Sequence, residues 1–89
     1  MINSIEDLAM LYGVPVSGLK RALYKYTACG AWIEWTKRSV TIGSIVEGSD
    51  AEFSKRFEFP VTVEEIDDWL EELEELTDEA WTDANGEWD

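Results

Sequence analysis

The residues of this chain that could do chemistry are carboxylates, and most of them are gathered in its last third. Residues 61–89 contain 13 acidic residues and no Lys or Arg, whereas residues 1–60 contain seven acidic and seven basic residues. The net charge of −13 therefore belongs to one segment. Such a field repels nucleic acid and anionic membranes and attracts basic surfaces, so it points to a basic partner.

The residue types that catalysis or a cofactor would need are scarce. The chain has no His, the commonest general base near neutral pH, and its one cysteine, Cys29, has no His to activate it. It has no glycine-rich phosphate loop and no Cys/His cluster for zinc, and its acids lack the alternating spacing of a calcium loop. We therefore expect a protein that is not an enzyme, with no cofactor and no metal, in which Cys29 is a buried core thiol.

A helix must position the acids. Thr62 and Glu65 match the capping box T-x-x-E, and Val61 and Ile66 have the spacing of a hydrophobic staple. Apolar residues then recur at intervals of three and four, on one face of a 3.6-residue period: Ile66, Trp69, Leu70, Leu73 and Leu76. The pattern predicts an amphipathic helix over residues 62–81 that frays after Thr77, followed by a loose tail over residues 82–89.

Two further segments precede this helix. Residues 1–28 predict a hairpin of two short helices, with Ser4 and Ser17 as N-caps and Gly13 in the turn. Residues 31–60 predict three antiparallel strands at Trp32–Trp35, Val40–Val46 and Phe57–Phe59. We thus expect one α+β domain of two short N-terminal helices, a three-stranded antiparallel sheet and a C-terminal acidic helix. No apolar run approaches the roughly 20 residues that span a bilayer, and the start lacks the basic region of a signal peptide, so we expect a cytoplasmic protein.

The N-terminal segment resembles the helix-turn-helix motif of DNA-binding proteins. Ala9 matches the small residue late in the first helix, Gly13 matches the turn glycine, and the positions that lock the helices are hydrophobic: Leu8, Tyr12, Val14, Leu19 and Ala22. Because the start of the second helix enters the major groove in that family, the resemblance implies DNA contacts by Val16, Ser17, Lys20, Arg21 and Tyr24, with Lys25 on the backbone. The competing interpretation is a compact helical hairpin whose bases pair with acids of the last helix or fix a dimer.

The acidic face also has two interpretations. No base stands three or four residues from any acid of the predicted helix, and each like-charge pair at that spacing costs a few tenths of a kcal/mol. An ordinary solvated helix mixes the signs and avoids this cost, although an acidic face can also serve solubility alone. Carboxylates on successive turns approximate the charge rows of duplex DNA, which has one charge per roughly 1.7 Å of axis.

Small size, strong acidity, many aromatic residues and missing catalytic groups make the chain similar to phage-encoded DNA-mimic inhibitors, including anti-CRISPR proteins. The segment from Val40 to Glu52, followed by Phe59–Thr62 and the acidic helix, also resembles small uncharacterised proteins of gut-bacterial phages. The first resemblance implies an inhibitor that occupies the basic groove of a nucleic-acid-binding enzyme, and a CRISPR effector such as Cas9 holds nucleic acid in a groove of this kind.

We therefore expect a phage inhibitor, a monomer or homodimer, that acts in the cytoplasm of the host bacterial cell on a basic nucleic-acid-binding protein. The acids expected to meet Lys and Arg of that target are Glu64, Glu65, Asp67, Asp68, Glu71, Glu72, Glu75 and Asp78. Trp81 or Trp88 would be an aromatic anchor, since Trp is favoured at binding hot spots. The alternatives are a small helix-turn-helix regulator and a phage structural or adaptor protein.

Overall fold

A computed structural model describes residues 1–26, 30–46, 48 and 51–85 of the chain. The elements run in the order α1 (Ile5–Leu11), η1 (Val16–Gly18), α2 (Leu19–Leu23), η2 (Tyr24–Tyr26), β1 (Ala31–Trp35), β2 (Ser39–Ile45), β3 (Glu52–Glu58) and α3 (Val63–Asn85), where η denotes a 3₁₀ turn. The strands form one antiparallel sheet in the order β1-β2-β3. The predicted α+β fold, with helices before and after a three-stranded antiparallel sheet, is confirmed.

The first helix begins and ends as its sequence predicts. The Ser4 hydroxyl accepts a hydrogen bond from the Asp7 N–H at 3.3 Å, and Gly13 turns the chain with a φ of +68°. The predicted cap at Ser17 is wrong. Pro15 is already the residue before η1, so Ser17 lies inside that turn, and neither η1 nor α2 has a side-chain cap.

The sheet differs from its prediction at the third strand. The predicted turn between the first two strands is present, because the Thr36 hydroxyl accepts the N–H groups of Arg38 and Ser39 at 3.1 Å. The third strand, predicted at Phe57–Phe59, instead spans Glu52–Glu58. It is an edge strand that exposes most of its residues, so its charged and polar side chains hide the alternation that marks a half-buried strand.

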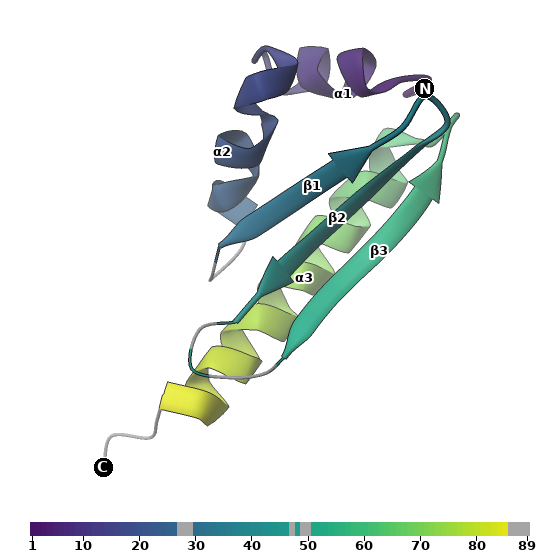
Figure 1. Ribbon diagram of the computed structural model, residues 1–89. Helices are drawn as coiled ribbons and strands as arrows, with labels where there is room; N and C mark the ends of the chain where they lie inside the picture. The colour runs from purple at the N-terminus through teal and green to yellow at the C-terminus, as the bar shows by residue number, and fades with distance from the viewer. Residues whose placement is uncertain (27–29, 47, 49–50, 86–89) are drawn as a thin grey trace.

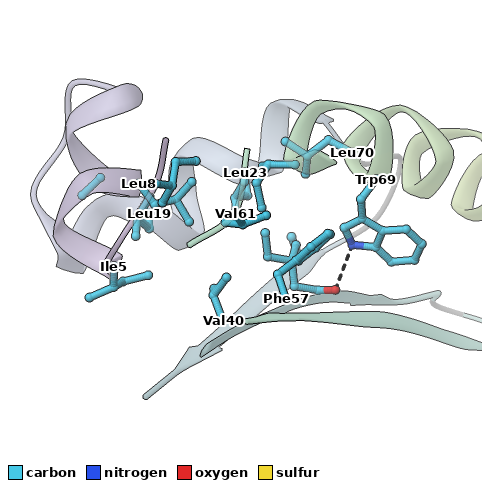
Figure 2. Close-up of a cluster of buried hydrophobic side chains, with 14 of the residues drawn as sticks. Ile5, Leu8, Leu19, Leu23, Val40, Phe57, Val61, Trp69 and Leu70 are labelled. Atoms are coloured by element: carbon cyan, nitrogen blue, oxygen red, sulfur yellow. Dashed lines mark hydrogen bonds between the residues drawn. The ribbon is translucent and has the colours of Figure 1, made fainter. Parts of the chain in front are cut away.

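All the helices cover the same face of the sheet. α2 packs against β1, while α3 crosses β2 and β3 (Figure 1). Figure 2 shows the apolar cluster between these layers, in which Leu8 and Leu23 from the N-terminal helices, Val40 and Phe57 from the sheet and Leu70 from α3 are all buried. The opposite face of the sheet has no helix over it, as far as the described residues go.

One polar contact fixes how α3 lies on the sheet. The indole N–H of Trp69 donates to the backbone carbonyl of Ile42 at 3.0 Å, the dashed line in Figure 2. Both groups are buried, and an indole donor buried without an acceptor would cost free energy, so this bond selects the position of α3 along β2. The sequence pattern gives no sign of it.

The last turns of α3 project past the sheet. From the level of Ile42 the sheet continues for three residues, to Ile45 opposite Glu52, which is about 10 Å. A helix rises that far in about seven residues, so α3 leaves the sheet near Leu76. Thr77 is fully buried, no described residue of α3 beyond it is, and Figure 1 shows the final turns beyond β2 and β3.

The predicted end of this helix is wrong. The acidic helix was expected over residues 62–81 with a loose tail over residues 82–89, but α3 continues to Asn85. None of Thr82, Asp83 and Ala84 is a Gly or Pro that would end a helix. The first such residue after the start of α3 is Gly86. Residues 86–89 lie outside the described part of the chain.

Candidate functional site

The acidic surface starts at a capping box that the structure confirms. The N–H of Thr62 donates to the Glu65 carboxylate at 3.0 Å, and the N–H of Glu65 donates to the Thr62 hydroxyl at 3.1 Å. Val61 and Ile66, predicted to form the staple, are both buried in the core cluster. The residue before the capping box, Val61, is also held by the N-terminal segment, because Ile2 and Val61 exchange backbone hydrogen bonds of 2.8 and 2.9 Å.

Hydrogen bonding changes the acidity of Glu65. The bonds from the backbone and then the side chain of Thr62 lower the pKa of the Glu65 carboxyl below its ordinary value of 4.5, and the positive charge of Lys55 lowers it further. Desolvation acts in the opposite direction and is outweighed. Glu65 is therefore ionised at neutral pH and is already engaged in holding the start of α3.

The acids of α3 form two parallel rows. One row has the spacing three, four, three, four and consists of Glu64, Asp67, Glu71, Glu74 and Asp78. The other row has the same spacing with one more step of four and consists of Glu65, Asp68, Glu72, Glu75, Glu79 and Asp83. Residues three and four apart are neighbours on a helix surface, and every one of these eleven residues is exposed. We call them the outer row and the β3 row.

The β3 row is named for its neighbour. Glu65 and Asp68 line a hollow of about 360 Å³ together with Lys55 and Arg56 of β3. The Lys55 ammonium lies over the ring of Phe57 at 5.4 Å and over that of Trp69 at 5.9 Å, both within cation–π range. Lys55 therefore connects β3 to the first half of α3.

The density of charge along α3 lies within the range of nucleic acid. Glu64 and Asp83 are 19 helical steps apart, about 28 Å at ~1.5 Å per residue. Eleven carboxylates over that length give one negative charge per about 2.6 Å of axis. Duplex DNA has one per roughly 1.7 Å when both strands are counted and one per roughly 3.4 Å along a single strand.

The structure gathers all the predicted acidic site residues on this one surface. The eight acids predicted as contacts belong to the two rows, while Trp81 is 43% exposed on the last turns of α3, after the sheet has ended. Asp83 was missed because it stands in the predicted tail, and the uninterrupted helix-forming sequence up to Gly86 was the signal for it. Trp88 and Cys29, the other two residues with predicted roles, lie outside the described residues.

The residues predicted from the helix-turn-helix resemblance lie on a separate surface. Ser17, Lys20, Arg21, Tyr24 and Lys25 are exposed, and Val16 is half-buried. The helix that would read DNA, α2, has five residues between two 3₁₀ turns. Arg21 and Lys25 share the lining of a hollow with apolar side chains of α1 and of the connection to α2.

Within the described ranges, no group of three or more His, Cys, Asp or Glu side chains is arranged to hold a metal ion. Among the described helices, none has the length and apolar character needed to cross a membrane. Comparison of the chain with protein-family models, with curated proteins and with solved structures finds no significant match.

Proposed function

We propose that this protein is a non-enzymatic phage inhibitor whose α3 imitates nucleic acid and occupies the basic groove of a host defence nuclease. The observation that supports the proposal best is the pair of exposed carboxylate rows, with one charge per about 2.6 Å of axis. A groove built for phosphates presents Lys and Arg at comparable intervals. A CRISPR effector such as Cas9, which holds nucleic acid in a positively charged channel, is the first target to test.

The absence of bases from α3 supports the same proposal on energetic grounds. Acids that are three and four residues apart repel one another along both rows, and a single Lys in each turn would relieve this. Stability alone therefore favours a mixed surface. A partner that supplies the missing cations explains the arrangement, because each carboxylate then gains a pair that it lacks within its own helix.

The first test is capture of Cas9 with guide RNA by the immobilised protein, with and without an excess of competing duplex DNA. The expected result is capture that duplex DNA displaces and that weakens as salt rises, because exposed charges are screened beyond about 8 Å at physiological ionic strength. Other purified defence nucleases follow in the same format. Retention of duplex DNA by the protein alone, lost on Lys20→Glu and Arg21→Glu, would instead support the helix-turn-helix alternative.

Two variants of equal charge separate the role of the surface from that of net charge. The first neutralises Glu64, Glu71 and Glu74 of the outer row to Gln, which keeps helix propensity. The matched control neutralises Glu34, Glu52 and Glu58, which are exposed on the strands. Exposed pairs contribute about 0.2–1 kcal/mol each, so the first variant should weaken capture about tenfold and the control should not. Equal loss in both variants would show that net charge alone is at work.

A further inference from the structure

A second surface of the molecule has the features of a docking site. A hollow of about 510 Å³ lies between α1, η1 and α2, with an apolar lining of Leu11, Tyr12, Val14, Pro15 and Ala22 beside the backbone of Gly18. Arg21 and Lys25 complete its lining, and both are exposed. Leu11 is 44% exposed, an unusual fraction for a leucine that lies beside a hydrophobic core. An apolar centre with a charged rim is the anatomy of a protein-binding patch.

The rim fixes the chemistry of the occupant. Two cations beside an apolar hollow favour a segment with an apolar anchor and acids within one turn of it. The projecting end of α3 combines these features, because Trp81 is 43% exposed there and the exposed Asp78, three residues earlier, is its neighbour on the helix surface. An indole can bury roughly 150–250 Å². Binding pockets usually have volumes of about 300–1,000 Å³, and the hollow falls within that range.

We propose that the end of α3 from one copy of the protein docks into this hollow of a second copy. The contact has to be between copies, since α1 and the end of α3 lie at opposite ends of a molecule about 47 Å long (Figure 1). In the docked pair Trp81 enters the hollow and Asp78 beside it meets the cations of the rim, Arg21 and Lys25. The interface is head-to-tail. In a pair, one copy keeps an unoccupied hollow and the other keeps an undocked helix end, so further copies can add and short chains can form.

Net charge determines how this association responds to salt. Two copies of charge −13 repel each other, while the contact itself joins opposite charges. Screening weakens the long-range repulsion more than the close contact, since the Debye length shortens from about 30 Å at 0.01 M to about 8 Å at 0.15 M. Self-association should therefore strengthen between these ionic strengths, which is the opposite of the response expected for capture of a basic nuclease. The inference does not depend on the proposed function.

Sedimentation velocity of the whole protein, from micromolar to millimolar concentration, tests the proposal at both ionic strengths. We expect reversible association that is at least several-fold stronger at 0.15 M salt. The hollow variant Arg21→Glu/Lys25→Glu and the end variant Trp81→Ala should each associate more than tenfold more weakly. Their matched controls, Lys20→Glu/Lys37→Glu and Thr82→Ala, change exposed residues outside the hollow and should associate like the original protein.

Mixing the two deficient variants is the decisive step. The hollow variant still has an intact helix end and the end variant still has an intact hollow, so the mixture should form a 1:1 complex although neither variant associates alone. Circular dichroism of each variant checks that it is folded. A protein that stays monomeric at millimolar concentration and 0.15 M salt would overturn the proposal, as would a folded pair of variants whose mixture forms no complex.

Discussion

Reversing one charge in the middle of α3 should make the protein more stable. Glu75 has four acidic neighbours at three and four residues, and all of them are exposed: Glu71, Glu72, Asp78 and Glu79. A like-charge pair at this spacing destabilises a helix by about 0.2–0.5 kcal/mol and an opposite pair stabilises it by a similar amount. Glu75→Lys changes four pairs at once, and Lys and Glu have nearly equal helix propensity.

The four changes would sum to about 2–4 kcal/mol if none were screened, and exposure to solvent reduces this to about 1–2 kcal/mol at low ionic strength. Thermal unfolding followed by circular dichroism measures the effect, since 1 kcal/mol corresponds to about 4–8 °C in a domain of this size. Glu75→Gln removes only the repulsion and should give about half the gain. Glu52→Lys, with the same change of net charge on an edge strand, is the control.

Salt provides a second check on the same reasoning. The advantage of Glu75→Lys should fall sharply in 1 M salt, where the Debye length is about 3 Å. A variant that is no more stable than the original at low salt, or that gains no more than Glu52→Lys does, would refute the claim that α3 carries an unrelieved repulsion. The proposed function adds that the more stable variant should capture its target less well.

The remaining predictions concern the scaffold that presents α3. Gly43→Ala should destabilise the fold by about 1–3 kcal/mol, because its Cβ would stand 2.6 Å from a backbone oxygen of β3 and from an indole carbon of β1, while Gly30→Ala, with nothing within 4 Å, should be close to neutral in urea unfolding. Trp69→Phe should cost about 1–3 kcal/mol in the same assay, because the buried hydrogen bond from α3 to a backbone carbonyl of β2 is lost. The pKa of Glu65 is lowered in the folded state, so its ionised form stabilises the fold above pH 4.5, and this contribution is lost as the pH falls through the folded pKa. Glu65→Gln keeps an acceptor for the Thr62 N–H but cannot be protonated in this range. Unfolding curves between pH 6 and 3 should therefore show that this variant is less sensitive to acid than the original protein.

The features that the sequence predicts correctly depend on neighbouring residues. The start of α3 follows from Thr62 and Glu65, three residues apart, and the end of α1 follows from Gly13 alone. The eight predicted acids fall on one surface because helical periodicity needs no knowledge of the rest of the molecule.

The features that it misses depend on distant residues or on solvent. Lys55 lies over Trp69 only because the register of β2 and β3 brings them together, and no local pattern encodes that contact. The start of β3 is hidden because an edge strand needs few apolar residues. The last turns of α3 do not pack on the sheet and need no apolar residues, so the apolar stripe in the sequence ends before the helix does.

The bridge between Ile2 and Val61 has a consequence for how the chain folds. These two residues exchange backbone hydrogen bonds although about sixty residues separate them along the chain, and both are buried. Ile2 can therefore pair with Val61 only after the segment between them has been synthesised. Contacts of such long sequence separation slow folding, since a large loop must close before they form. We expect the bridge to form after the transition state, so removing residues 1–3 should speed unfolding and leave the refolding rate nearly unchanged, with stopped-flow unfolding and refolding as the measurement.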